Sequence, residues 1–494
     1  MSYFDEQWYL LRYPDVAAAV KSGEVESGLA HFQKKGRAEG RLSCNPGPAR
    51  EVAEANKVVS ARVCHFDRLY VTSAGTGLIV GWIDNRGDSI QSLAFAPYVG
   101  DPIPLGQQVL RCYRNDVIEK KPKDERNYDY GLWVLFEGLA NRLPHLGGHI
   151  RAEFASGLDS EIAVAAHVVP PEEMRGRVLD AVGWPTRLPS SPIHLGKTIG
   201  PILRRLNAEV IASAKVAAPV VHGKRLRAPR LSIVIVYQRI ESMLRQAALL
   251  AEVSSISDVE FICVCHQPEM ASAFHAMADS AHVLYGLNVV SVSASNHLGF
   301  AKANNAAAQI AGGKTLLFLN EGVIPGDRDC LERALHVALQ VGEKDVVGAQ
   351  LLTEDNSIQH IGRSFKLAGC ADALWCNDEV QKGMPVGQLS GDALLNVDAV
   401  TGGAMLVQRG SFLDLGGFDE RYLSDEYRDS DYCLRARGAG GRIAVSPSML
   451  FYCLESGAAF PRPPREWAVS LMDQVFFNET WRSTIENSRA STSN

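Results

Sequence analysis

Polar residues follow four apolar runs in the second half of the chain, and their side-chain types suit ligand binding. They are Tyr237-Gln238-Arg239, Cys265-His266-Gln267, Ser295-Asn296-His297 with Gly299-Phe300, and Asn320-Glu321-Gly322. If the runs are parallel strands, their carboxyl ends meet at one edge of a sheet, where such folds bind ligands. The turn at Gly299 also opens a helical pattern, whose first N–H groups would attract a phosphate or another anion. Because a glycine in such a turn is also common for packing alone, this pattern identifies no ligand by itself.

Carboxylates are concentrated at Asp425, Glu426, Asp429 and Asp431. Asp431 and Arg435 are spaced i, i+4 on a helical pattern, which predicts a structural ion pair on one face of that helix. Asp429 lies near the start of the same pattern, where a carboxylate often caps the first N–H groups of a helix. Capping is therefore one interpretation of Asp429, and a second interpretation follows below.

Ten cysteines are spread over the 494 residues without a paired C-x-x-C framework, which argues against a disulfide scaffold. Cys263, Cys265 and His266 lie close together, but no second pair of zinc ligands is suitably spaced. Cys263 and Cys265 would face the same side of a strand, so we expect buried thiols. Reduced thiols are typical of a cytoplasmic protein.

The apolar runs must be held by a regular framework, and the segments between them supply it. Runs at 231–237, 259–265, 287–293 and 314–320 are continuous, as in strands buried on both faces, and helical patterns separate them. This alternation predicts an α/β fold with a doubly wound, mostly parallel sheet.

The preceding part of the chain has a different character. Residues 1–50 predict a small helical module with helices beginning near Pro14 and Ser27. Short alternating segments separated by Gly, Asn and Asp clusters predict an antiparallel β-sandwich over 56–170.

The remaining boundaries follow from a change in composition. Residues 171–228 are interpreted as a linker with one helix, between Ile199 and Val216, and the α/β domain is expected over 229–480. The basic end of the linker, at 224–230, is expected to be solvated, and contact with a nucleotide or peripheral contact with anionic lipid at the inner membrane is the alternative.

The overall composition limits the classes of function. With 50 basic and 56 acidic residues, a formal charge of −6 and a pI near 6.1, the chain offers no electrostatic reason to expect nucleic-acid binding. No apolar run approaches the ~20 residues that cross a bilayer, so no transmembrane segment is expected. The first residues are acidic where a signal peptide would be basic.

Two segments resemble family 2 glycosyltransferases, whose fold is called GT-A. They are ASNHLGFAKANNAAAQIAGGKTLLFLNEGVIPGD and VTGGAMLVQRGSFLDLGGFDERYLSDEYRDSDYCLRARGAGGRI, and the similarity extends over 231–457. It implies a nucleotide-sugar donor, a saccharide acceptor, a manganese or magnesium ion and transfer with inversion. The parts before the α/β domain resemble the front modules of bacterial surface-polysaccharide glycosyltransferases, which implies protein partners for them.

The resemblance also implies roles for single residues. Asp429 falls on the position of the general base, although the acidic residue that normally precedes it is Arg428 here. The implied nucleotide-sugar-binding positions are Tyr237, Arg239, Cys265, Gly299, Phe300, Lys302, Asn305, Asn320 and Glu321. The implied acceptor-side positions are Gly402, Gly403, Glu426 and Asp431. Base and helix cap thus stand as two interpretations of Asp429.

The metal-binding positions depart from the family pattern. Where the family has D-x-D, this chain has Asn320-Glu321-Gly322, which lacks both carboxylates. Glu321 is one residue out of register, so strand geometry would turn its side chain to the opposite face. Cys453 replaces a histidine, and its soft thiol is poorly matched to manganese or magnesium. Cys265 replaces the aspartate that normally holds the base of the nucleotide.

Two functions are therefore compatible with the sequence. The first is an active glycosyltransferase with Asp429 as base, in which Lys302, Arg239 or His297 contacts the diphosphate. The second is an inactive GT-A domain that binds a saccharide, a nucleotide or a partner protein in polysaccharide or glycoconjugate assembly. Convergence of Glu321, Glu426 or Asp425 on one cleft would restore a cation site.

Overall fold

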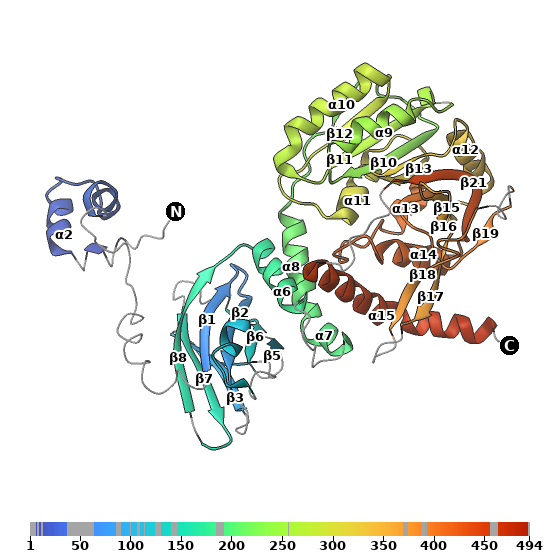
Figure 1. Ribbon diagram of the computed structural model, residues 1–494. Coiled ribbons are helices and arrows are strands. Elements are labelled where there is room, and N and C mark those ends of the chain that lie inside the picture. Colours follow the sequence, from blue (N-terminus) through green and yellow to red (C-terminus); the bar gives the residue numbers. More distant parts are fainter. Residues whose placement is uncertain are drawn as a thin grey trace. The chain divides into compact units, whose positions relative to one another are not determined.

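The computed structural model describes residues 6, 9–10, 13–36, 64–84, 90–98, 100–105, 109–112, 114–123, 130–139, 147–157, 159–183, 192–254, 256–368, 374–386, 391, 393–454 and 463–492. The chain divides into two compact units, Met1–Val169 and Pro170–Asn494 (Figure 1). The finer division into four segments stays a prediction. The end of the expected helical module and the last residues of the family resemblance lie outside the described residues.

The first unit begins with a short helical segment. Its elements are α2 (Pro14–Lys21), α3 (Gly28–His31) and the π-helix η1 (Phe32–Gly36). The helices begin where the sequence predicts, because Pro14 occupies the first turn of α2 and the Ser27 hydroxyl accepts a 3.0 Å hydrogen bond from Ala30 N–H. A small core of Tyr9, Val16 and Phe32 holds these elements together.

The rest of the first unit is one curled, mostly antiparallel sheet. Its strands are β1 (Cys64–Val71), β2 (Gly77–Ile83), β3 (Ile90–Pro97), β4 (Ile103–Pro104), β5 (Val109–Cys112), β6 (Gly131–Phe136), β7 (Gly147–Phe154) and β8 (Asp159–Val168), with α5 (Asn115–Ile118) after β5. Within the described ranges the eight strands follow the order β4-β3-β7-β8-β1-β2-β6-β5. The sheet forms a half-barrel around an apolar core.

The prediction of a β-sandwich is wrong in this respect. β1 and β8 pair in parallel, with Leu69 opposite Ala166 and Val71 opposite Val168, and this pairing joins two groups of strands into one sheet. Alternating polarity shows that each strand buries one face. It does not show which strands become neighbours, so a sandwich and a half-barrel look alike in sequence.

The second unit opens with helices that the sequence analysis treated as a linker. They are α6 (Pro171–Gly183), α7 (Pro192–Thr198) and α8 (Gly200–Ser213), and the long α15 (Pro464–Thr492) packs against α6 and α7. α8 matches the helix expected between Ile199 and Val216, but the expectation of one helix in this stretch is wrong, because α6 and α7 precede it. Proline suggested a linker, but Pro171 and Pro192 occupy the first positions of their helices, where proline is well tolerated.

A mixed sheet forms the centre of the second unit. Its strands are β9 (Val220–His222), β10 (Leu231–Tyr237), β11 (Val259–Cys265), β12 (Asn288–Val292), β13 (Thr315–Asn320), β14 (Val323–Pro325), β15 (Val346–Leu352), β16 (Ile358–His360), β19 (Leu395–Asn396), β20 (Ala404–Gln408) and β21 (Ile443–Cys453). Strands β12, β11, β10 and β13 are adjacent and parallel, as predicted. Antiparallel pairing of β20 with β13 and of β9 with β12 makes the whole sheet mixed rather than mostly parallel.

The order of the parallel strands locates a ligand site. Along the chain the strands add on one side of β10 until β13, which pairs on the other side. The connection reverses between β10 and β13, and ligands bind outside the carboxyl ends of strands at such a switch point. The second unit also contains a two-stranded hairpin, β17 (Arg363–Leu367) with β18 (Trp375–Glu379).

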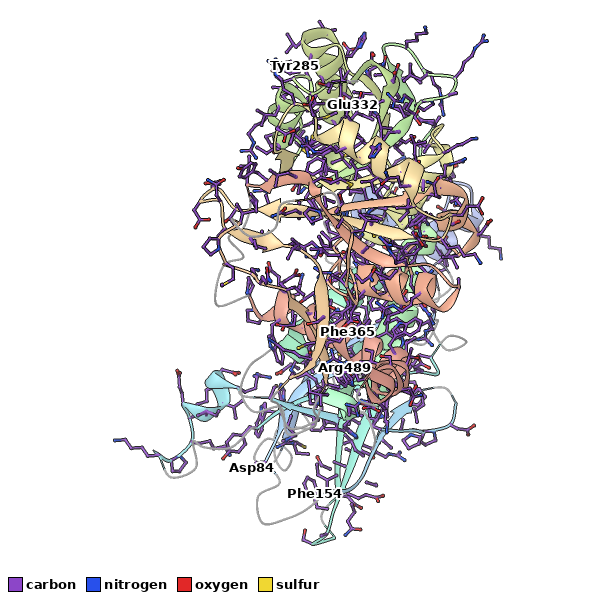
Figure 2. All side chains as sticks on the ribbon, turned by 90° about the vertical axis from the view of Figure 1, so that its right-hand side faces the viewer. Asp84, Phe154, Tyr285, Glu332, Phe365 and Arg489 are labelled. Carbon is purple, nitrogen blue, oxygen red and sulfur yellow. The ribbon has the colours of Figure 1, made fainter. Side chains whose placement is uncertain are left out.

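Helices cover both faces of the sheet (Figure 1). One face is covered by α9 (Ser242–Leu250), α10 (Ala271–Tyr285) and α12 (Cys330–Gln340), and the other by α11 (Phe300–Ile310), α13 (Arg409–Asp414), α14 (Arg428–Gly438) and part of α15. Short 3-10 turns lie at Ile256–Asp258 and Pro268–Met270. Neighbouring residues of β10 divide between the two cores, since Ile233 packs with the first set and Val234 with the second. Near its C-terminal end, α15 also contacts the hairpin, where Arg489 donates a hydrogen bond to Phe365 O (Figure 2).

Among the helices that the structure describes, none has both the length and the apolar character needed to cross a bilayer.

Candidate active-site cleft

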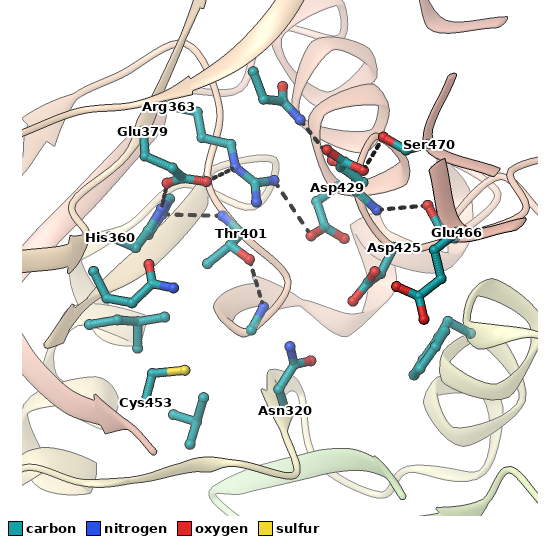
Figure 3. Close-up of a pocket in the computed structure, with 18 of the residues that line it drawn as sticks. Asn320, His360, Arg363, Glu379, Thr401, Asp425, Asp429, Cys453, Glu466 and Ser470 are labelled. Carbon is teal, nitrogen blue, oxygen red and sulfur yellow. Dashed lines mark hydrogen bonds and ion pairs between the residues drawn. The ribbon is translucent and has the colours of Figure 1, made fainter. Parts of the chain in front are cut away.

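A cleft of about 780 Å³ lies at the carboxyl ends of β10 and β13 (Figure 3). The ends of these strands contribute Gln238 and Asn320, and α11 contributes Phe300. The opposite side comes from segments far apart in the chain, namely Gln359, His360, Arg363, Asn377, Glu379, Lys382, Thr401, Gly403, Leu423, Ser424, Asp425, Glu426, Asp429, Glu466, Val469 and Ser470. A cavity is thus present at the predicted switch point, and polar side chains form much of its lining.

Asp429, in the first turn of α14, lines the cleft and is only 2% exposed. Its Oδ2 accepts a 2.6 Å hydrogen bond from Gly402 N–H, and its Oδ1 accepts a 3.1 Å hydrogen bond from Arg428 Nε. Arg363 Nη1 lies 3.8 Å from Oδ2. The cap interpretation is wrong, because Tyr427 is the N-cap residue and none of the described side chains caps that end of α14.

Arg363 belongs to a buried charge network that the sequence analysis missed. Its Nε donates a 2.7 Å hydrogen bond to Glu379, whose other oxygen lies 2.5 Å from His360 Nδ1 (Figure 3). Thr401 N–H donates to His360 Nε2 at 3.2 Å, so the imidazole proton must be on Nδ1. The register of the hairpin pairs Arg363 with Glu379, but sequence alone gave no reason to align these two strands.

The electrostatics of this network keep His360 neutral and Glu379 and Arg363 charged. Burial lowers the pKa of His360, against the opposite effect of Glu379, so the imidazole stays neutral. Burial alone would raise the pKa of Glu379, but the charge of Arg363 and the hydrogen bond from His360 lower it to about 2. Burial alone would lower the pKa of Arg363, but Glu379 and Asp429 raise it. On this wall of the cleft, the positive charge of Arg363 is therefore compensated by the carboxylates of Glu379 and Asp429.

Glu321 faces away from the cleft. Its carboxylate accepts hydrogen bonds of 3.0 Å from both Gln238 N–H and Arg239 N–H, and one of 3.2 Å from the Ser242 hydroxyl. Arg239 Nε lies 3.4 Å from the same carboxylate. This placement agrees with the register argument, which turned Glu321 to the face opposite Asn320. Glu321 thus accepts hydrogen bonds from the segment that leads into α9 and forms an ion pair with Arg239. Neither of these two side chains lines the cleft.

In the cleft, the positions at which the family pattern has metal ligands do not fit a manganese or magnesium ion. Asn320 and Cys453 line it, but they supply a neutral amide and a soft thiol. Asp425 and Glu426 also line it, and Glu426 accepts a 2.6 Å hydrogen bond from the Ser470 hydroxyl. Over the described residues, no group of three or more His, Cys, Asp or Glu side chains is placed to hold a metal ion.

Several residues that the resemblance places in the donor site make hydrogen bonds within the protein. Tyr237 is buried and its hydroxyl donates to Gln246 Oε1 at 2.7 Å. The Cys265 thiol donates to Gln267 O at 3.1 Å, and burial raises its pKa. Asn305 donates to Phe418 O at 2.9 Å, which ties α11 to the segment before α14.

Four more predicted site residues make other contacts or line a second cavity. Asp431 accepts hydrogen bonds of 2.8 Å from both Arg435 Nε and Trp481 Nε1, so the predicted i, i+4 pair is confirmed, and Asp431 is not among the residues that line the cleft. Lys302 Nζ donates to the carbonyls of Ile211 and Ala214 at the end of α8. Gly299 and Phe300 line a second cavity, described next.

A second cavity, of about 490 Å³, adjoins the cleft and shares with it Gln238, Phe300, Leu423, Arg465 and Val469. The Phe300 ring stacks on His266 with centroids 5.1 Å apart and planes 15° apart. Burial lowers the pKa of His266 to about 4, so this imidazole is neutral near pH 7. Helices α6, α8 and α15 form the far wall of this cavity, and the sequence analysis had not placed them near a site.

No family model matches the chain. It is 28% identical over 221 residues to the O-antigen biosynthesis protein RfbC of Myxococcus xanthus, an alignment that covers 42% of this chain and 16% of that protein. It is 29% identical over 160 residues to the uncharacterized protein y4gI of Sinorhizobium fredii, over 32% of this chain and 17% of that protein. The chain therefore spans only a small part of the length of the curated relatives that it matches.

Two solved structures resemble the chain at low identity. GalNAc-T7 with UDP, GalNAc and Mn²⁺ matches at 14% identity over 49% of this chain and 48% of that one, with a TM-score of 0.36. The mannosyltransferase PcManGT of Pyrobaculum calidifontis, in complex with GDP-Man and Mn²⁺, matches at 12% identity over 64% and 87%, with a TM-score of 0.33. At such scores a superposition does not by itself establish a common fold.

Proposed function

We propose that the second unit is a glycosyltransferase domain of the GT-A type. It would transfer a sugar from a nucleotide-sugar donor to a hydroxyl group of a saccharide, with inversion and with Asp429 as general base. The observation that carries the proposal is the position of Asp429, a buried carboxylate that lines a cleft at the switch point of the sheet. A base in this position can reach a hydroxyl group held between Asn320 and the opposite wall.

The contacts of Asp429 are compatible with that role. Each carboxylate oxygen has two acceptor sites, and the hydrogen bonds from Gly402 and Arg428 occupy one on each oxygen. An acceptor hydroxyl can use a remaining site, and those two contacts hold the carboxylate still. Figure 3 shows Asp429, Asp425 and Asn320 around one hollow, where carboxylate and amide groups would accept and donate hydrogen bonds to a saccharide.

The wider biological setting is part of the same proposal. The sequence resemblance and the partial similarity to an O-antigen biosynthesis protein favour a growing surface polysaccharide as acceptor. We propose that the domain works in the cytoplasm, in peripheral contact with the inner membrane, and that the first unit binds partner proteins.

One specific observation favours a second candidate, a domain that binds a nucleotide or saccharide without turnover. Among the described residues, no group of three or more His, Cys, Asp or Glu side chains is placed to hold a divalent cation in the cleft. Two guanidinium groups, from Arg428 and Arg363, also lie beside the carboxylate of Asp429. The first feature disfavours metal-assisted transfer. The second places two positive charges beside the proposed base.

The two candidates are distinguished by measuring binding and turnover separately. A panel of UDP- and GDP-sugars is titrated by calorimetry, with and without Mn²⁺, and release of the nucleoside diphosphate is then assayed with saccharide acceptors. We expect Asp429→Asn to abolish turnover while donor binding persists, and Asp414→Asn, at an exposed site on α13, to behave like the wild type. Donor binding without turnover would favour the second candidate. Absence of donor binding across the panel would overturn the proposed function.

A further inference from the structure

The second cavity differs in charge from the main cleft. The cleft is lined by the carboxylates Glu379, Asp425, Glu426, Asp429 and Glu466 and by the cations Arg363, Lys382 and Arg465. The second cavity is lined by the cations Arg175, Lys302 and Arg465, by the imidazoles His266 and His297, and by the carboxylates Glu172 and Glu420. One cavity is therefore predominantly acidic and the other carries an excess of cations, and Arg465 is the charged residue that lines both.

Arg465 lies at the junction and is held in a defined orientation. Its Nε and Nη2 donate hydrogen bonds of 2.7 and 2.6 Å to the two oxygens of Asp180 on α6. The guanidinium packs over the backbone of α6 at Gly176, where an added Cβ would lie 3.5 Å from Nη2. A guanidinium has five N–H donors, so three remain for a ligand after the pairing with Asp180. The side chain is 57% exposed, which leaves these donors accessible from the cavity.

Arg175, five residues before Asp180 along α6, adds a second guanidinium. Its Nη1 donates a 2.5 Å hydrogen bond to Asn207 Oδ1 on α8, which is a neutral acceptor. Burial lowers the pKa of Arg175, and the charge of Arg465 lowers it further, although Glu172 has the opposite effect. The positive charge of Arg175 is therefore only partly compensated by the protein, and an anion in the cavity would stabilise it.

The side chains that sequence analysis suggested for a diphosphate are committed elsewhere. Lys302 Nζ bonds two carbonyl groups at the end of α8, and Arg239 pairs with Glu321. His297 Nδ1 contacts His266 O at 3.0 Å. Of the cationic groups named for this cavity, Arg465 and Arg175 are the ones with a guanidinium fork suited to phosphate oxygens.

We propose that Arg465 and Arg175 hold the diphosphate of the donor in the second cavity and supply there the charge neutralisation that a divalent cation would otherwise provide. This proposal rests on the proposed function. In the transfer, the bond between the anomeric carbon and the β-phosphate oxygen breaks while a bond from the acceptor oxygen to that carbon forms. The acceptor proton passes to Asp429, and the charge that develops on the leaving diphosphate is stabilised by the two guanidinium groups.

The test is calorimetric binding of three probes, UDP, GDP and inorganic pyrophosphate, to the full chain in EDTA and in Mn²⁺. For the wild type we expect the same Kd in both buffers for the bound nucleotide. Loss of a charge-assisted hydrogen bond weakens binding by about 10- to 100-fold, which we expect for Arg465→Gln and Arg175→Gln. Arg465→Lys keeps the charge but loses the fork, so an intermediate Kd is expected.

Arg177→Gln is the matched control, because Arg177 lies on α6, pairs with Glu173 at 2.6 Å and is not a lining residue of the cavity. It should bind all probes like the wild type. Thermal unfolding of each variant checks folding. The pair of Arg465 with Asp180 is half exposed, so Arg465→Gln should fold normally even if Arg175→Gln does not.

Each outcome separates this inference from the proposed function. Nucleotide binding that disappears in EDTA, or that is equal in Arg465→Gln and Arg177→Gln, would overturn the inference and leave the proposed function standing. Binding of pyrophosphate without either nucleotide would support the arginine site and overturn the proposed donor. Absence of binding of all three probes would overturn both.

Discussion

The carboxylate of Asp429 contacts the backbone of Gly402 directly, through a hydrogen bond of 2.6 Å from Gly402 N–H to Oδ2. A Cβ at position 402 would lie 2.7 Å from Asp429 Oδ1. The carboxylate can therefore approach this segment only because residue 402 lacks a side chain. Through this contact, the segment before β20 and the first turn of α14 fix the position of the proposed base.

We expect Gly402→Ala to displace Asp429 and to reduce turnover more strongly than donor binding. Forcing a methyl group into a filled site costs about 1–3 kcal/mol in the free energy of unfolding, measured by urea denaturation. Gly410→Ala is the control, since an added Cβ there meets nothing within 4 Å. Equal turnover in both variants would show that the contact with Gly402 does not position the base.

Glu379→Gln should destabilise the fold, because it leaves the positive charge of Arg363 without its nearest carboxylate. Removing one partner of a buried ion pair costs about 3–5 kcal/mol, and we expect the lower end because the Glu379 side chain is 21% exposed. Asp378→Asn alters the neighbouring residue of the same strand, which pairs with exposed Lys366, and should unfold like the wild type. If the two variants are equally stable, the network does not support the wall of the cleft.

Stability should also depend on pH through Asp473. Its oxygens accept hydrogen bonds from Leu423 N–H, Ser424 N–H and the Ser424 hydroxyl, yet burial outweighs these contacts and raises its pKa from 3.8 to about 7. Between these values the folded state holds a proton that the unfolded state releases. This contribution to stability is thus fully present below about pH 4 and is lost as the pH rises to about 7.

The difference between wild type and Asp473→Asn isolates this effect from other carboxylates. Urea unfolding at a series of pH values should show the free energy of unfolding of the wild type falling relative to the variant, by at most about 1.4 kcal/mol per pH unit in this window. Parallel curves would mean that Asp473 titrates alike in both states.

Trp481→Phe should loosen the docking of α15. Trp481 Nε1 donates a 2.8 Å hydrogen bond to Asp431 Oδ1, and Asp431 is only 3% exposed. An unsatisfied buried acceptor costs about 1–3 kcal/mol, to be measured by chemical denaturation. Trp467→Phe, at a site on the same helix that is 38% exposed, is the control and should have little effect. A similar loss in both variants would indicate a general effect of the smaller ring rather than of the hydrogen bond.

Features that depend on near neighbours in the chain were predictable. The four parallel strands follow from continuous apolar runs, and the Asp431–Arg435 pair follows from helical spacing. The orientation of Glu321 follows from the two-residue period of a strand. The position of Asp429 near a cleft at the strand ends was also predictable, because it depends on topology and on a motif.

The surroundings of the site were decided only by tertiary structure. Arg363 meets Glu379 through a hairpin register, and Asp429 meets Gly402 across 27 residues of sequence. Arg465 reaches the second cavity because α15 packs on α6, a contact between segments 285 positions apart at Asp180. Such contacts depend on which elements become neighbours, and so does the choice between a sandwich and a half-barrel. By itself the sequence determined strands, helix faces and missing metal ligands, because these depend on local period and side-chain chemistry. The charges around the proposed diphosphate required the folded chain, because they come from helices that a local reading of the sequence treats as a linker and a C-terminal extension.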